Sequence, residues 1–564
     1  MPTFLEFASN EQIVKLLIKE RVKVALNNGL KEIDTPGGYV SAIAREVAPL
    51  MPPRPWKKPR RQERLCVDTG KKRTNKQILM RSLALTIKAH RKEASKHPYL
   101  RRLDDFVQSI QAEIRSTSEL SFRESIHIVG KPKKIDSSGV HILRPLCTFN
   151  ALRDKILIAL VNSYLSEVFD PLLHEEVLAY RPLRFYHNSN TKVLTDRDNS
   201  IDNLQKYRRC FAEYGVYVAE CDIQKYFDTI NHDVIRRYFD DFARQVEQKC
   251  GDFGYRYTRR ILDAYLNSYS FYNSVVNLNE ELLKGSPAKM FEAPKDSLFI
   301  ERGCYSQAEF EASKGKIGIP QGGALSGLIS NVILSSIDKR SVLAKNDRQL
   351  FFSRYGDDIL LMHPNKEVCQ QLIDAYRKEL TQNKLLYHEF VNVSDEGYMH
   401  PDGRTLPAVW SQKSRNPFLW GRSASDRNAM DWIGFLGYEV RYTGEVRLRR
   451  SSFDDKMKNI KRKYYKAAQT QLAKGNDAKI SEERILKKIN YFKSDGLAKA
   501  KSLNRNRYST TQAKKLDAYT NLHIYKLLYK IAKNNALSAD QFTYYWQQAK
   551  EGNYANYTET ITPR

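Results

Sequence analysis

Two apolar runs meet at a pair of acids in residues 351–363, which read FFSRYGDDILLMH. Aromatic and aliphatic residues on both sides of a Gly-Asp turn predict a β-hairpin. The hairpin would hold two carboxylates, Asp357 and Asp358, side by side at its tip. Neighbouring carboxylates repel each other, so the pair either needs a nearby cation or belongs to an ordinary exposed turn.

A third acid, Asp222, follows a predicted strand at residues 216–223, VYVAECDI. Residues 316–338 read KIGIPQGGALSGLISNVILSSID, where a glycine-rich loop precedes a helix that we expect at about 324–338. Each segment alone is also typical of an inert turn or a capped core helix. The informative property is therefore the order in which the three segments occur.

An Asp-bearing strand, a P-Q-G loop with its helix, and a Tyr-Gly-Asp-Asp hairpin, in that order, resemble the palm of a reverse transcriptase. The segment GFLGYEV (434–440) resembles the hairpin that follows the palm in retroelement enzymes. Upstream, HILRPLCTFNALRDKILIALVNSYLSEVFDPLL (141–173) and LAYRPLRF (178–185) resemble the fingers of bacterial group II intron and retron-type enzymes. The resemblance implies an α+β, right-hand polymerase fold with fingers and palm.

The same resemblance implies a set of site residues. Asp222, Asp357 and Asp358 would be catalytic and, with the backbone carbonyl of Ile223, would bind two Mg²⁺ ions, with Mn²⁺ as a substitute. Asp228 is expected to orient its turn rather than bind metal. The implied nucleotide-binding residues are Arg144 and Arg181 at the triphosphate, Gln321 and Gly322 beside the sugar and template, Tyr355 near the primer terminus, and Phe227.

Phe227 bears on whether the product is DNA or RNA, since viral RNA polymerases also contain YGDD. Those enzymes carry a second acid at this position, which engages the ribose 2′-hydroxyl, whereas a bulky ring would clash with it. The pattern P-Q-G-x-x-x-S at residues 320–326 is likewise that of reverse transcriptases. We therefore predict an RNA-directed DNA polymerase that uses dNTPs.

Two positions depart from the group II intron pattern, which usually has YADD and a proline after the P-Q-G-x-x-x-S serine. Here the residues are Gly356 and Gly327. A lysine is also expected near residues 385–389, which read LLYHE, so the proton donor to pyrophosphate stays unassigned. With its terminal extensions, the chain resembles bacterial reverse transcriptases of the defence-associated, abortive-infection (unknown-group) type, which implies antiphage defence and a dedicated structured non-coding RNA.

Other functions stay open. A mobile-element enzyme, intron-encoded or retron-type, would use the same palm. DNA synthesis could be template-independent or primed by a protein hydroxyl, for which the tail offers Tyr544, Tyr545, Tyr554 and Tyr557. A maturase-like RNA-binding protein with an inert palm is a non-enzymatic alternative, which the three intact acids argue against. Whether the chain forms a homo-oligomer is also open.

Four regions are expected along the chain. They are a helical extension with a basic Pro-rich arm (1–105), fingers (106–215), a palm (216–446) and an all-α, basic, thumb-like region (447–564). Residues 11–27 and 154–170 show helical apolar spacing, and residues 349–355 read as a strand. Four prolines between Pro52 and Pro59 preclude a continuous helix there, which predicts an extended linker or arm.

The net charge of +28 over 564 residues suggests a polyanionic partner. Residues 54–102 carry +14 and residues 451–564 carry +13, so the basic flanks are expected to grip template RNA or a duplex backbone. No apolar run is long enough for a membrane helix, which predicts a cytoplasmic protein. The seven cysteines lack a C-x-x-C pair, which argues against a zinc ribbon or a disulfide framework.

Overall fold

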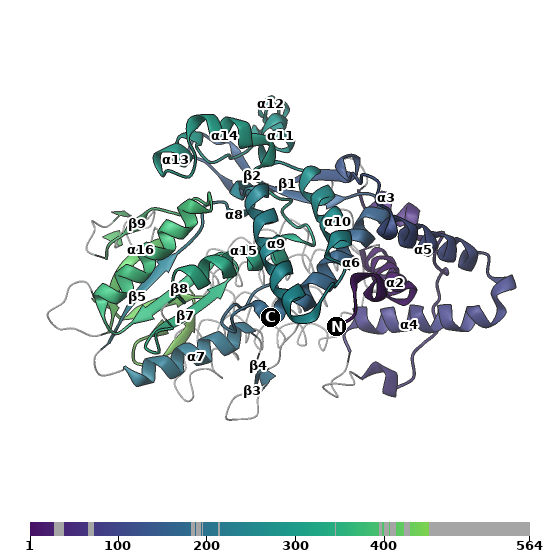
Figure 1. Ribbon diagram of the computed structural model, residues 1–564, viewed down its shortest axis with the longest axis horizontal. Helices are drawn as coiled ribbons and strands as arrows, with labels where there is room; N and C mark the ends of the chain where they lie inside the picture. Colours follow the sequence, from purple (N-terminus) through teal and green to yellow (C-terminus); the bar gives the residue numbers. More distant parts are fainter. Residues whose placement is uncertain are drawn as a thin grey trace, which may run out of the picture.

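The computed structural model describes residues 1–27, 39–65, 73–181, 186–187, 193–194, 196–211, 215–344, 346–393, 398–399, 405–406, 413–421 and 429–449. These residues form a mixed α+β structure, as the sequence predicted (Figure 1). The predicted helices after residue 450, and the four tail tyrosines, lie outside the described residues.

A six-stranded sheet contains both acidic segments. Its strand order is β13-β12-β5-β8-β7, with β9 also paired to β12. β5 lies between β8 and β12 and is antiparallel to both. The strands are β5 (Val216–Cys221), β7 (Phe351–Tyr355), β8 (Asp358–His363), β9 (Phe390–Val391), β12 (Ser414–Trp420) and β13 (Ala429–Met430). The predicted strand and hairpin are thereby confirmed.

The central strands β5 and β8 are largely apolar because both faces of this sheet are covered. Ala219 of β5 and Leu361 of β8 face the main core, which includes α15 (Ser326–Arg340) and α16 (Lys366–Gln382). Their neighbours Val218 and Leu360 face a second core with α7 (Asp196–Cys210) and a three-stranded sheet. That sheet comprises β14 (Trp432–Phe435), β15 (Tyr438–Arg441) and β16 (Val446–Leu448), and it contains the FLG segment.

A separate three-stranded sheet is built from distant parts of the chain. β1 (Ile126–Ile135) and β2 (His141–Phe149) form an antiparallel hairpin, and β6 (Lys289–Phe291) adds in parallel to β2. β6 belongs to the long segment between α9 (His232–Cys250) and the P-Q-G loop, which therefore returns to the side of β2. In Figure 1 the later part of this segment, from α11 (Phe271–Ser274) to α14 (Gln307–Ser313), lies above the central helices.

Helices make up most of the remaining described residues. The predicted helices at 11–27 and 154–170 correspond to α2 (Asn10–Asn27) and α6 (Leu152–Phe169). The others of eight residues or more are α3 (Tyr39–Val47), α4 (Asn75–His90), α5 (Tyr99–Arg115) and α10 (Tyr255–Asn267). The shorter ones are α1 (Phe4–Phe7), α8 (Tyr226–Thr229), α11 (Phe271–Ser274), α12 (Asn279–Leu283), α13 (Asp296–Glu301) and α14 (Gln307–Ser313). No helix among the described residues is long and apolar enough to span a membrane.

The Pro-rich stretch is not helical, as predicted, but it packs on the protein. Trp56 is buried and donates its indole N–H to the carbonyl of Pro52 at 3.1 Å. The guanidinium carbons of Arg21 and Arg54 lie 5.3 and 4.9 Å from the centre of the indole ring. The backbone N–H of Lys57 donates to the hydroxyl of Thr86 on α4 at 2.8 Å. Residues 52–61 therefore pack on the protein and do not form a free arm; we call them the docked strap.

Candidate active site

The three predicted carboxylates lie at the same end of neighbouring strands in the central sheet. Asp222 directly follows β5, whose last residue, Cys221, pairs with Ile359 of β8. Asp358 begins β8 and pairs with Tyr355 across the turn, which Gly356 and Asp357 complete. The register of β5 on β8 therefore brings acids that are 135 residues apart in the sequence to the same end of adjacent strands.

A lysine that the sequence analysis did not identify contacts the first of these acids. Lys413 lies just before β12, and its Nζ is 2.5 Å from Oδ2 of Asp222. His388 Nε2 lies 3.8 Å from the same oxygen, and the backbone N–H of Asp222 donates to Ser414 Oγ at 3.1 Å. The residues expected to supply a lysine, 385–389, instead place His388 beside Asp222.

The acids at the turn are affected by one another's charge. Burial and the charge of Asp222 raise the pKa of Asp357. Asp358 is open to solvent on one side, yet partial desolvation and the charges of Asp357 and Asp222 raise its pKa to about 6. A cation placed among the three would relieve this repulsion, so the donor set fits a divalent metal.

The carboxylates do not by themselves complete a metal site. Within the described parts of the chain, no three His, Cys, Asp or Glu side chains converge closely enough to hold an ion. Mg²⁺ commonly takes one or two carboxylates and completes its shell with substrate phosphates and water. The arrangement therefore fits a magnesium site that forms when substrate binds.

Gln321 is held in place by the acid that we expected to orient its turn. Its Nε2 donates to Oδ1 of Asp228 at 2.7 Å, and its carbonyl accepts from the N–H of Cys147 at 2.8 Å. Burial raises the pKa of Asp228 to about 6, although the Gln321 hydrogen bond opposes the rise. The P-Q-G loop is thus fixed between α8 and β2.

Phe227 is part of the same arrangement. Its carbonyl accepts from the N–H of Ile319 at 2.8 Å, which ties it to the residue before the P-Q-G sequence. Its half-buried ring packs edge-on against Tyr226, with ring centres 5.4 Å apart. Phe227 on α8 is therefore bonded to the loop that contains Gln321. Gly322 is exposed at the surface of that loop.

The two predicted phosphate-binding arginines have different surroundings. Arg144 is an exposed residue of β2, and its charge lowers the pKa of both Asp228 and Asp357, so it faces the site. Arg181 is nearly buried, and its guanidinium bonds to the carboxylate of Asp170 at 2.7 and 3.0 Å. The arginine fork at residue 181 therefore holds the loop after α6, and its contact with a triphosphate remains a prediction.

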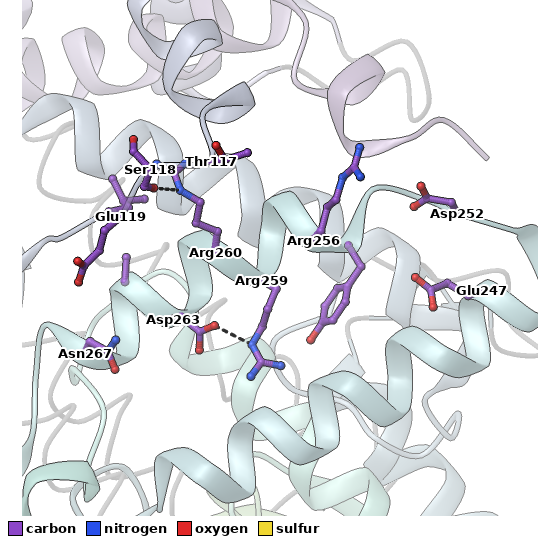
Figure 2. Close-up of a pocket in the computed structure, with 13 residues that line it drawn as sticks. Thr117, Ser118, Glu119, Glu247, Asp252, Arg256, Arg259, Arg260, Asp263 and Asn267 are labelled. Atoms are coloured by element: carbon purple, nitrogen blue, oxygen red, sulfur yellow. Dashed lines mark hydrogen bonds and ion pairs between the residues drawn. The ribbon is translucent and has the colours of Figure 1, made fainter.

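A cleft of about 770 Å³ lies along α10, and none of the three carboxylates lines it (Figure 2). Arg259 pairs with Asp263 at 2.9 Å, and Arg260 donates to the carbonyl of Ser118 at 2.6 Å. The charged residues that line the cleft are Arg256, Arg259, Arg260, Glu119, Glu247, Asp252 and Asp263. The four acids outnumber the three arginines, so the lining of this cleft carries no excess of positive charge.

The fold and the positions of the three carboxylates agree with a match to a protein-family model. Residues 131–389 match the family model described as "Reverse transcriptase (RNA-dependent DNA polymerase)". The match includes β5, the P-Q-G loop with α15 and the acidic hairpin. Residues 131–389 are thus similar to the domain of reverse transcriptases, which are RNA-directed DNA polymerases. Just over half of the chain, including both basic flanks, lies outside the match.

Solved telomerase structures are among those similar to this chain. Apo telomerase from Candida tropicalis without its C-terminal domain has a TM-score of 0.33 and 12% identity, covering 59% of this chain and 56% of that one. Telomerase from Candida albicans with a telomeric RNA fragment has a TM-score of 0.29 and 12% identity, and the match covers 78% of this chain and 66% of that one. The corresponding C. tropicalis complex has a TM-score of 0.35 and 11% identity, and the match covers 82% of this chain and 66% of that one. The chain thus spans 56 to 66% of these proteins. No curated protein matches the sequence.

Proposed function

We propose that this protein is a Mg²⁺-dependent reverse transcriptase with a right-hand fold, in which Asp222, Asp357 and Asp358 are the catalytic carboxylates. The supporting observation is that all three lie at the same end of neighbouring strands, a position set by the pairing of β5 with β8. The central sheet would be the palm, and the sheet of β1, β2 and β6 would belong to the fingers.

The chemistry follows from this arrangement. Two bound Mg²⁺ ions would stabilise the attacking and leaving oxygens of an in-line displacement at phosphorus. Asp222 and Asp357, with the carbonyl of Ile223, would hold the metals, and Asp358 would act from the primer side. Arg144 would contact the triphosphate, since a guanidinium fork matches phosphate oxygens. Lys413 would neutralise Asp222 until the metals bind.

We further propose that the product is DNA. Phe227 would exclude a ribose 2′-hydroxyl, and Gln321 and Gly322 would line the sugar and template side. The hydrogen bond from Gln321 to buried Asp228 supports this proposal, because it fixes the loop that would border the nucleotide. Tyr355, exposed at the end of β7, would lie near the primer terminus.

The template that we propose is a structured non-coding RNA, gripped in part by the docked strap. Lys57, Lys58 and Arg61 of the strap are exposed, and none has a carboxylate partner among the described residues. The biological role that we propose is antiphage defence, on the strength of the sequence resemblance and the terminal extensions. Plaque counts on cells expressing the protein, with and without Asp357→Asn plus Asp358→Asn, would test this role.

The decisive experiment for the chemistry is dNTP incorporation on a primed RNA template. The double variant Asp357→Asn plus Asp358→Asn should lose at least a thousandfold in rate while keeping its unfolding midpoint. Asp374→Asn is a matched control, because this acid lies on α16 and pairs with Arg377 on the surface. Equal activity of the double variant and the wild type would refute the site.

The RNA-binding proposal has its own measurement. Replacing Lys57, Lys58 and Arg61 by Gln should weaken RNA binding and lower the slope of log K against log salt by about one for each lost phosphate contact. Arg91→Gln is the control, because Arg91 already pairs with Asp104 at 2.7 Å. An unchanged salt slope in the triple variant would exclude the strap from the RNA interface.

A further inference from the structure

The ring of Tyr180 fits between two glycines beside the acidic turn. A Cβ added at Gly327 of α15 would lie 2.7 Å from Cγ of Tyr180, too close for any other residue without movement. A Cβ at Gly356 would lie 3.6 Å from Cε2 of the same ring. These are the two positions at which the sequence departs from the group II intron pattern. The two departures therefore share one structural neighbour.

The backbone just before Tyr180 is held by hydrogen bonds to both β7 and α15. The N–H of Leu178 donates to the carbonyl of Arg354 on β7 at 3.0 Å. The side-chain amide of Asn331, buried on α15, donates to the carbonyl of Ala179 at 2.8 Å. Tyr180 itself has a φ of 58°, which is unfavourable for an aromatic residue and persists only where the surroundings impose it.

Although the segment is anchored, the Tyr180 side chain is only partly buried. Tyr180 is 54% exposed and Tyr355 is 39% exposed; no other aromatic is among the exposed large hydrophobic residues of the described chain. Burial, followed by the charges of Asp357, Tyr355 and Asp358, raises the pKa of the Tyr180 phenol, so the ring is neutral at physiological pH. Two exposed aromatic side chains thus flank the acidic turn.

We propose that Tyr180 and Tyr355 form an aromatic platform that supports the terminal base pair of the primer–template duplex. The proposal rests on the proposed function, because a primer 3′-hydroxyl must reach the carboxylates at this turn. Aromatic rings contact the faces and edges of any base, so they hold nucleic acid without regard to sequence. Tyr180 is a positioning residue in this arrangement, and Gly327 provides the space for its ring.

The test uses the full-length protein and an RNA template annealed to a DNA primer whose 3′ nucleotide is 2-aminopurine. Its fluorescence reports contact between an aromatic ring and the primer end. Tyr180→Ala should change the fluorescence of the bound duplex, raise KM for primer–template about tenfold, and change KM for dNTP less than threefold. Tyr180→Phe should restore both values, because it keeps the ring. Leu283→Ala, which removes an exposed side chain of α12, is the control.

A second variant tests the ring's position without removing it. Gly327→Ala should displace the Tyr180 ring and reproduce the higher KM for primer–template. Unchanged fluorescence and unchanged KM in Tyr180→Ala would overturn the proposal. A lower unfolding midpoint with equal losses for primer–template and dNTP would also overturn it, since the ring would then only pack the hairpin on α15.

The outcomes separate this inference from the proposed function. If the double variant of Asp357 and Asp358 is inactive while Tyr180→Ala binds the duplex normally, only the platform is wrong. If the double variant retains full incorporation, the proposed catalytic site itself is wrong.

Discussion

Arg354 and Asp338 form a fully buried ion pair directly beneath the acidic turn. Nε of Arg354 lies 2.7 Å from Oδ2 of Asp338, and neither side chain is exposed. The same guanidinium donates to Ser335 Oγ at 2.9 Å and to the carbonyl of Gly356 at 3.1 Å. α15 and the acidic turn are therefore joined through one side chain.

Removing one partner of this pair should be costly. Arg354→Met would leave the Asp338 carboxylate buried without its cation, and we expect a loss of about 3 to 5 kcal/mol in the free energy of unfolding. The additional change Asp338→Leu should recover much of that loss in urea titrations. DNA synthesis should stay low in the double variant, because the Gly356 carbonyl still lacks its donor. Wild-type stability in Arg354→Met would contradict this view of the pair.

Phe227→Ala should relax the choice of sugar. With the ring removed, we expect the preference for dNTPs over NTPs to fall about tenfold or more, measured as the ratio of kcat/KM values on one template. Phe227→Tyr keeps the ring and should retain the preference. An unchanged ratio in the alanine variant would exclude Phe227 as the gate.

Lys413→Met should strengthen metal binding in the absence of nucleotide. The Lys413 ammonium lies on Asp222 and repels any cation that approaches the same carboxylate. We expect Mn²⁺ affinity, measured by electron paramagnetic resonance, to rise severalfold. Lys366→Met removes an exposed lysine elsewhere and should have no effect. Equal or weaker Mn²⁺ binding in Lys413→Met would show that the lysine does not compete with the metal.

Stability should depend on pH through His232. This buried side chain donates to the carbonyl of Gly318 at 2.7 Å, and burial lowers its pKa to about 4. As pH falls below about 6.5, the unfolded chain takes up the proton before the folded protein does. The His232 contribution, about 3 kcal/mol, should therefore be present at neutral pH and be lost between about pH 6.5 and 4.

His232→Gln is the matched variant, since its amide can still donate to Gly318 but does not titrate. The difference in unfolding free energy between wild type and this variant should shrink or reverse as pH falls through that window. A pH-independent difference would show that His232 is not responsible.

The parts of the site that the sequence predicted depend on local patterns. The apolar runs before Asp222 and around Asp357 define strands by residue type, and the P-Q-G glycines precede a helix. Lys413 was missed because its place beside Asp222 depends on the register of β12 against β5, which no local spacing encodes. Tyr180 was missed for the same reason, since α15 and the hairpin reach its ring only in the folded chain. The addition of β6 to β2 is likewise a long-range pairing.

The position of β5 in the middle of the sheet has a consequence for synthesis of the chain. β5 pairs with β8 and β12, and Val218 lies opposite Phe418, which leaves the ribosome 200 residues later. At roughly 5 to 20 residues per second, this delay lasts about 10 to 40 seconds. The edge of β5 that pairs with β12 has no native partner during that time, and the edge that pairs with β8 waits 144 residues, since Val218 lies opposite Met362. The nascent chain therefore passes through an aggregation-prone interval, so a larger chaperone supply should raise the yield of active protein.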